Sequence, residues 1–185
     1  IPARSGRISI ESFCVESGRW TKRGDEDPTK FDSSNERIVT KDLKIAANGA
    51  RSQQEVWDKV SEAQRRLGNS VGGSVNSTKS ASSLQLSLEN KKVVATIDEY
   101  VAKLSGVING QSDVLGYAFA INGKINSADI YVSNALFKKV WGKMLKASAT
   151  EAVAESNGVR LADPVKGEAV LGMIADVEKA RSNER

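Results

Sequence analysis

Apolar residues spaced three or four apart predict the helices of this chain. The clearest run lies in residues 52–67, at Val56, Val60, Ala63 and Leu67. Ser52 and Glu55 form a capping box before this run and Gly68 follows it, which is the pattern of a helix that begins after Ser52 and stops at Gly68. We therefore expect an amphipathic helix here, with Trp57 at the edge of its buried stripe.

Three more helices follow from the same spacing. One covers residues 90–104, a long one begins after its N-cap Ser133, and a last one begins at Asp163 and Pro164, an N-cap followed by proline. The long helix carries an apolar stripe broad enough to indicate burial against a sheet. The positions expected to face inward are Val93, Val94, Ile97, Val101 and Leu104, then Leu136, Phe137, Val140, Trp141, Met144, Leu145 and Ala152, and finally Val170, Met173, Ile174 and Val177.

Two alternating runs flank Asn122 and Gly123 and predict a β-hairpin, because both central positions of a type I′ turn adopt positive φ. Pairing directly across this turn places Asp129 opposite Gly116. The bulky residues then share one face of the hairpin: Leu115, Tyr117, Phe119 and Ile121. The small residues share the other face, which we expect to pack closely against a helix or strand: Val114, Gly116, Ala118 and Ala120.

The N-terminal part of the chain is less regular. Residues 7–16 alternate well enough for a strand with a bulge near Glu11 and Ser12, Gly18 ends that strand, and a polar loop follows. Residues 68–83 are rich in glycine, serine and asparagine and predict a mobile loop. Helices and antiparallel strands without a βαβ rhythm indicate an α+β fold, in which the strands, including the hairpin around Asn122-Gly123, are packed by three to four helices.

Length and composition indicate how many domains the chain forms and which classes of partner it is not suited to bind. At 185 residues and 39% hydrophobic content, the chain suits one domain with a sizeable core. We expect residues 1–158 to form this domain and residues 159–185 to form a linker and a C-terminal helix packed on it. The net charge of +4 comes from interleaved cations and anions, and only 5% of residues are aromatic, which argues against a nucleic-acid partner. No apolar run is long enough to span a bilayer, so we expect no membrane partner.

The chain contains no histidine, and this narrows its chemistry. Ser/His/Asp and Cys/His catalytic groups and histidine-ligated metals are excluded, and we expect neither a metal nor a cofactor. The single cysteine, Cys14, lies between two apolar residues and is interpreted as a small core residue, not as a nucleophile. The stretch GSVNSTKS, residues 73–80, resembles a phosphate-binding loop. However, Thr78 replaces its second glycine and a helix precedes it, so we interpret it as a polar linker.

The candidate site lies around the sequence FCVESGRW, residues 13–20. We expect Glu16 and Arg19 to form an ion pair across the Gly18 turn, with Trp20 stacked on the guanidinium or buried beneath it. As a structural corner, this pair only stabilises the fold. As a ligand site, Arg19 presents a planar fork to a phosphate or carboxylate, and Trp20 forms a wall for a ring.

Two residues of the following helix extend this corner. Gln53 supplies an amide, and Trp57 supplies a second aromatic wall or, as the favoured alternative, packs in the core. The ligand-binding candidates are therefore Glu16, Arg19, Trp20, Gln53 and Trp57.

Three motifs resemble a known family. They are CVESGRW at residues 14–20, QQEVW at residues 53–57, and the hairpin with the long helix after it. Together they span residues 1–152 and are similar to the bacterial ADP-ribosylglycohydrolase and rhodanese-phosphatase associated protein domain family. The resemblance implies an α+β domain of unsettled biochemical function, whose name records association with enzymes that handle ADP-ribose and phosphate esters. The residues on the family's characteristic positions are Cys14, Glu16, Gly18, Arg19, Trp20, Gln53, Val56 and Trp57.

The chain departs from this family pattern at its start. Family members usually carry a substantial segment before CVESGRW, whereas this chain begins at Ile1 and without an initiator methionine. We expect either the C-terminal part of a larger domain or the loss of an N-terminal part. A missing N-terminal segment or a partner subunit would then cover exposed apolar surface. The lack of an initiator methionine also favours an extracytoplasmic location.

Three functions are compatible with the sequence. We favour a non-enzymatic binding or accessory module whose corner recognises a small nucleotide-like or anionic ligand. The alternative is a hydrolase or transferase acting on ADP-ribose or phosphoester compounds, with Glu16 or Asp129 as base and Arg19 as anion clamp, with or without a divalent metal. The third is a structural protein-interaction domain with an exposed sheet or helix face.

Overall fold

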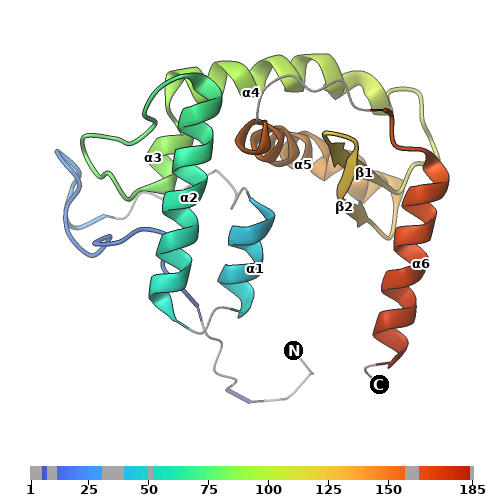
Figure 1. Cartoon of the computed structure of the whole chain (residues 1–185), viewed down its shortest axis with the longest axis horizontal. Coiled ribbons are helices and arrows are strands. Elements are labelled where there is room, and N and C mark those ends of the chain that lie inside the picture. The colour runs from blue at the N-terminus through green and yellow to red at the C-terminus, as the bar shows by residue number, and fades with distance from the viewer. Residues whose placement is uncertain (1–5, 8–11, 31–39, 50–51, 157–162, 184–185) are drawn as a thin grey trace.

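Helices dominate the fold, and one antiparallel hairpin packs beside them (Figure 1). The computed structural model describes residues 6–7, 12–30, 40–49, 52–156 and 163–183. The elements in chain order are α1 (Lys41–Gly49), α2 (Gln53–Val71), α3 (Leu84–Leu88), α4 (Lys91–Leu104), the 3-10 helix η1 (Ser105–Ile108), β1 (Gly116–Ile121), β2 (Lys124–Ile130), α5 (Asn134–Glu155) and α6 (Gly167–Asn183). This order confirms the predicted α+β class. None of the described helices combines the length and the apolar character needed to cross a bilayer.

Helix α2 begins where the sequence predicts and ends later. The Ser52 hydroxyl oxygen accepts a hydrogen bond from the Glu55 backbone N–H at 3.3 Å, as in a capping box. The helix continues through Gly68 and closes at Gly72, whose φ of 68° is the left-handed conformation that favours glycine. Gly68 is buried, and a Cβ there would lie 2.9 Å from the Gly73 carbonyl oxygen. The predicted stop at Gly68 was wrong, because this glycine lets the next loop pass closely.

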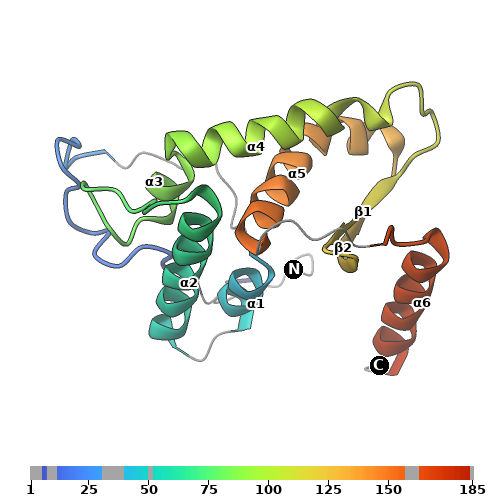
Figure 2. The same cartoon turned by 45° about the horizontal axis from the view of Figure 1, so that its top comes forward.

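Helix α5 contributes to two cores (Figure 2). Its second half is buried among other helices and packs against α2 and α4. The broad apolar stripe predicted for this helix is therefore explained by burial against helices as well as against the hairpin. The larger core includes Leu43, Val56, Val60, Leu67, Leu84, Leu88, Val93, Ile97, Ala149 and Val153.

The hairpin packs against the first half of α5 through its predicted bulky face. Tyr117 stacks on Phe137 with ring centroids 6.2 Å apart, and it meets Trp141 edge-on at 5.4 Å. Trp141 is also anchored by a hydrogen bond from its Nε1 to the Ser105 carbonyl oxygen at 3.0 Å. These aromatic contacts form the second core and fix the hairpin on the helix.

The hairpin turn has the predicted geometry, and the two residue pairs next to it keep the expected register, but from Phe119 onward the strands pair one residue out of it. Asn122 and Gly123 adopt φ of 51° and 76°, as a type I′ turn requires. An irregularity in the ladder leaves Asn126 of β2 without a paired residue. Because of this bulge, Asp129 does not lie opposite Gly116 as predicted.

The opposite face of the hairpin is exposed. Ala118 and Ala120 are both exposed, and Ile130 and Val132 are 64% and 92% exposed. The expectation that this face packs closely against a helix or strand was therefore wrong within the described residues.

Gly116 lies where the hairpin leaves least room for a side chain. A Cβ there would lie 2.1 Å from the Asp129 carbonyl oxygen, far inside van der Waals contact. We expect Gly116→Ala to destabilise the protein by about 2 kcal/mol, because the strand backbone must move to admit the methyl group. Gly142→Ala is the matched control, since Gly142 is exposed within α5 and a Cβ there has no atom within 4 Å. We expect this control to stabilise by about 0.5–1 kcal/mol. If urea unfolding shows the same change in stability for both variants, the Asp129 carbonyl oxygen does not lie as close to Gly116 as described.

Two N-terminal predictions need correction. Residues 12–16 form no strand, while residues 8–11, the rest of the predicted strand, lie outside the described residues. The segment 72–83 is anchored to the helices, since Val75 is 1% exposed and Ser83 is 0% exposed. Its interpretation as a mobile linker was wrong, and it leads directly into α3, which the sequence did not predict.

Helix α6 is present and lies at the hairpin end of the molecule (Figures 1 and 2). The predicted start was wrong, because the helix begins at Gly167 and not directly after Asp163. Val177 is 62% exposed, so it does not face inward as expected. The same prediction was wrong for Leu104 of α4 and Leu136 of α5, which are 42% and 40% exposed. The predicted boundary after residue 158 and the packing of the last segment on the domain remain predictions, because residues 157–162 lie outside the described parts of the chain.

Candidate functional site

The sequence FCVESGRW leads into a tight turn. Gly18 adopts φ of 76°, and its carbonyl oxygen accepts hydrogen bonds from the Thr21 backbone N–H at 2.9 Å and the Thr21 hydroxyl at 2.7 Å. The predicted turn at Gly18 is thus present. Together with the loop that follows, it brings Arg19 and Arg23 to one carboxylate, that of Glu26.

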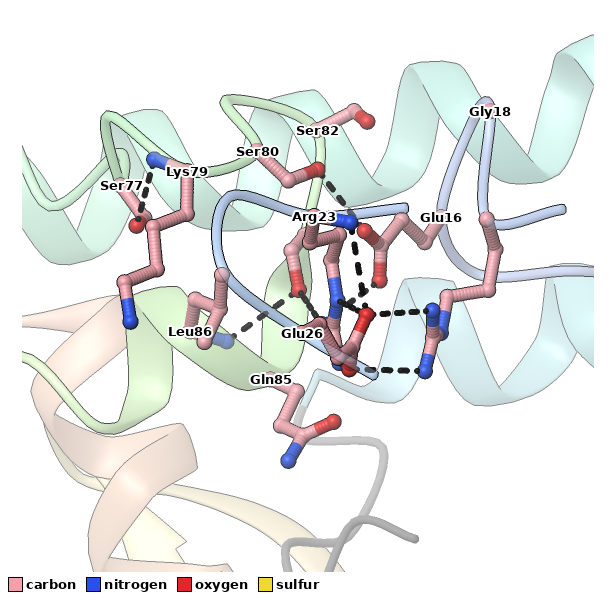
Figure 3. Close-up of polar contacts among 12 residues, drawn as sticks. Glu16, Gly18, Arg23, Glu26, Ser77, Lys79, Ser80, Ser82, Gln85 and Leu86 are labelled. Carbon is pink, nitrogen blue, oxygen red and sulfur yellow. Dashed lines mark hydrogen bonds and ion pairs between the residues drawn. The ribbon is translucent and has the colours of Figure 1, made fainter. Parts of the chain in front are cut away.

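We refer to Glu16, Arg19, Arg23 and Glu26 as the ionic corner (Figure 3). The Arg19 guanidinium donates to both Glu26 oxygens, at 3.1 and 3.2 Å. Arg23 donates to the same carboxylate from Nε at 3.3 Å and from NH2 at 2.9 Å, and its NH1 donates to Glu16 at 3.2 Å. Arg23 and Glu16 are 6% and 7% exposed. Two guanidinium groups and two carboxylates therefore neutralise one another in a largely buried cluster.

The segment of residues 72–83, which we call the serine-rich loop, also forms hydrogen bonds with the ionic corner. The Ser80 hydroxyl donates to Glu16 at 2.8 Å, and the Ser83 hydroxyl accepts from Arg23 at 3.0 Å. Gln64 of α2 holds this stretch in place by donating to the Ser83 carbonyl oxygen at 3.3 Å. Both oxygens of Glu16 therefore have partners, as the burial of a charged group requires.

The Arg23–Glu26 pair of the corner keeps its charges over a wide range of pH. The Arg23 side-chain hydrogen bond lowers the pKa of the Glu26 carboxyl to about 2, and the positive charges of Arg23 and Arg19 act in the same direction. The hydrogen bond to Glu26 also raises the pKa of Arg23, against the effect of burial. The Arg23–Glu26 pair is thus fully ionised at neutral pH.

This pKa shift predicts that the folded state becomes less stable as the pH falls. A carboxyl with a lower pKa in the folded chain stabilises the folded state above its unfolded pKa, and the contribution is lost as pH falls toward the folded pKa. We expect the contribution of Glu26 to be complete above 4.5, the ordinary pKa of a glutamate side chain, and to be lost between pH 4.5 and about 2. The urea midpoints of wild type and Glu26→Gln should therefore converge over this range. A difference that stays constant would contradict the shift.

The predicted ion pair between Glu16 and Arg19 was wrong. Arg19 pairs with Glu26, and Glu16 pairs with Arg23. Because Glu16 is buried against the serine-rich loop, it meets the buried guanidinium of Arg23, while Arg19 stays nearer the surface with Glu26.

Gln53 makes a structural contact. Its Oε1 accepts the Cys14 backbone N–H at 2.8 Å, and its Nε2 donates to the Cys14 carbonyl oxygen at 2.7 Å. The side-chain amide thus pairs with the backbone much as a neighbouring strand would. Cys14 is half-buried, and its neighbours Phe13 and Val15 pack against the larger core.

The two tryptophans of the predicted site have different surroundings. Trp20 is 81% exposed, so the alternative in which it is buried beneath a guanidinium was wrong. It lines a cavity of ≈ 60 Å³ together with Arg19 and Glu26. Trp57 is half-buried on α2, and its Nε1 is hidden from solvent with no hydrogen-bond partner among the described residues.

A larger cleft adjoins the corner. Its volume of ≈ 550 Å³ lies within the range of small-molecule sites. Arg23 and Glu26 line one side of it, and Figure 3 shows Lys79 and Gln85 near this pair. The other lining residues are Asp25, Lys79, Gln85, Leu86 and Glu89.

Asp129 lies far from this cleft. It belongs to β2, and the hairpin stands at the opposite end of the molecule from residues 12–30 in both views (Figures 1 and 2). The structure therefore does not bring Asp129 and Arg19 together. No group of three or more histidine, cysteine, aspartate or glutamate side chains within the described ranges could hold a metal ion.

The sequence analysis missed Arg23, Glu26 and Lys79. The first two belong to KRGDED, residues 22–27, a stretch that we interpreted only as interleaved surface charge. Lys79 lies in the segment interpreted as a linker. A dense alternation of basic and acidic residues beside a tryptophan was the signal that could have indicated the corner.

Comparison with known protein families matches residues 1–185 to the ARG and Rhodanese-Phosphatase-superfamily-associated Protein domain, and the chain belongs to this family. The resemblance carried by residues 1–152 is thereby confirmed, and the match extends beyond them. No curated protein and no solved structure matches the chain.

Proposed function

We propose that this member of the family is a non-enzymatic binding or accessory module that holds a small nucleotide-like or anionic ligand in the cleft beside the ionic corner. The family name records an association with other protein superfamilies, and association is not activity, so the proposal depends on the site itself. The observation that carries it is the cleft of ≈ 550 Å³ with the Arg23–Glu26 ion pair in its wall.

The ionic corner suits the role of a rigid wall. Its charged groups are matched by one another and by Ser80 and Ser83, so their positions do not depend on a ligand. Lys79 offers an ammonium group and Gln85 offers an amide to a phosphate or carboxylate, and Leu86 offers an apolar contact. A few polar groups around an apolar contact are typical of small-molecule sites.

The geometry favours binding over the enzymatic alternative. Glu16 is buried and already accepts hydrogen bonds from Arg23 and Ser80. The fork of Arg19 is directed at Glu26, and Asp129 belongs to the far end of the molecule. The base and the anion clamp named for a hydrolase or transferase therefore do not face one shared cleft.

Ligand binding can be tested by thermal shift and calorimetry. We expect at least one of AMP, ADP-ribose, NAD and ribose 5-phosphate to raise the melting temperature and to bind saturably. Leu86→Trp should fill the cleft and abolish this binding, whereas Leu136→Trp, at a 40% exposed position on α5, should leave it unchanged. If none of the four compounds binds, the ligand-binding proposal is wrong.

The hairpin supports a second candidate function, that of a structural protein-interaction domain. Its exposed face carries Ile130 and Val132, at 64% and 92% exposure, beside exposed alanines. If this face mediates self-association, light scattering after size exclusion will give a mass above the 19.9 kDa of one chain. A monomer whose mass does not change with concentration would count against it.

A further inference from the structure

The charges that meet a ligand in the cleft are those outside the ionic corner, because the corner neutralises itself. Its two arginines are matched by its two glutamates. The charged residues that remain in the lining are one cation, Lys79, and two carboxylates, Asp25 and Glu89. The cleft is therefore short of positive charge.

This balance disfavours ligands with several phosphates. A diphosphate would bring its negative charges to a single ammonium group, near two carboxylates, and like charges in a partly enclosed cleft repel one another. A sugar avoids this conflict, because carboxylates accept hydrogen bonds from hydroxyl groups. Acidic side chains bind ribose in this way in dinucleotide sites. A ligand with many hydroxyls and one phosphate fits the lining best.

Lys79 is held in the lining of the cleft by its backbone and by the stem of its side chain. Its backbone N–H donates to the Ser77 hydroxyl at 3.2 Å. Its side-chain stem lies against Gly24, where a Cβ would be 3.2 Å from Lys79 Cγ. Gly24 has a φ of 54°, so both backbone conformation and space favour glycine beside this lysine.

Glu89 also lines the cleft, and Gln85 orients its carboxylate. One of its oxygens accepts a hydrogen bond from Gln85 Nε2 at 3.0 Å. A carboxylate has about four lone-pair sites, so Glu89 can accept further hydrogen bonds from a sugar. Asp25 is exposed and adds a second carboxylate to the same cleft.

We propose that the cleft selects a sugar monophosphate, with Lys79 binding the phosphate and Asp25 and Glu89 accepting hydrogen bonds from the sugar hydroxyls. This inference rests on the proposed binding function and specifies its ligand class. It assigns the phosphate and the sugar to different groups of the lining, so each part can be tested by its own variant.

Calorimetry with ribose 5-phosphate, 2-deoxyribose 5-phosphate, ribose and ADP-ribose tests this assignment. In the wild type we expect ribose 5-phosphate to bind more tightly than the other three. Lys79→Met should weaken the affinity for ribose 5-phosphate by roughly tenfold to a hundredfold, because a charge-assisted hydrogen bond is lost. The variant should then bind ribose 5-phosphate no more tightly than ribose. Glu89→Gln and Asp25→Asn should reduce the preference over the deoxy sugar. Lys22→Met, at an exposed lysine outside the cleft, is the control and should change nothing.

The outcomes separate this inference from the proposed function. If nucleotides bind but Lys79→Met binds them as well as the wild type, the assignment of the phosphate is wrong while the binding function stands. If ADP-ribose binds more tightly than ribose 5-phosphate, the preference for one phosphate is wrong. If no compound binds, both proposals are wrong.

Discussion

Arg23→Met is expected to destabilise the protein by about 3–5 kcal/mol, because it leaves the buried carboxylate of Glu16 without its charged partner. Arg23 and Glu16 are 6% and 7% exposed, and the guanidinium also bonds to Glu26 and Ser83. No exposed side chain in the described structure is expected to cost as much. Urea unfolding of the wild type and the variant measures this loss in the free energy of unfolding.

A double variant shows whether the buried charge is the cause. Glu16→Gln combined with Arg23→Met removes both charges of the pair, so it should be less destabilising than the sum of the two single variants. Arg65→Met replaces an exposed arginine of α2 and should change stability by no more than about 0.5 kcal/mol. If Arg23→Met is as mild as this control, the corner does not stabilise the fold.

Glu151→Ala is the second variant with a large expected effect, about 2–4 kcal/mol. Glu151 of α5 is 1% exposed, and its carboxylate accepts the Lys41 backbone N–H at 2.6 Å, at the first residue of α1. It also accepts from Lys44 Nζ at 3.0 Å. The alanine variant leaves the first backbone N–H of α1 without this acceptor and removes the hydrogen bonds from α1 to a buried carboxylate of α5.

Hydrogen exchange locates this effect. The amides of α1 should lose protection in Glu151→Ala more than those of α4, because the lost bonds belong to α1. Lys59→Met is the control: it breaks an ion pair of α2 in which both side chains are partly exposed, 37% for Lys59 and 30% for Glu62, and it should leave the protection of α1 and α4 unchanged. Equal loss of protection in both helices would contradict a local role for Glu151.

The sequence predicted those elements whose signals are local. The capping box at Ser52, the N-cap at Ser133 and the Asn122-Gly123 turn all depend on neighbours within a few residues, and each is present. The strand register was not predictable in this way. The ladder skips Asn126, and alternation of apolar and polar residues alone does not reveal such a bulge.

The sequence predicted an ion pair at the Gly18 turn but not which residues pair there. Glu16 and Arg19 do lie at an ionic corner, yet each has a different partner from the one expected. The pairing depends on Ser80 and Ser83, more than sixty residues along the chain from Glu16, which bury one carboxylate and not the other. Such long-range contacts leave no periodic signal in the sequence.

The central claim is that the cleft beside the ionic corner binds a small ligand, and an NMR titration tests it most directly. Ribose 5-phosphate is added to ¹⁵N-labelled protein while the backbone amide shifts are followed. The account predicts saturable shifts at residues 23–26 and 79–89, with the hairpin amides of residues 116–130 unchanged. Shifts confined to the hairpin, or no saturable shifts at all, would contradict it.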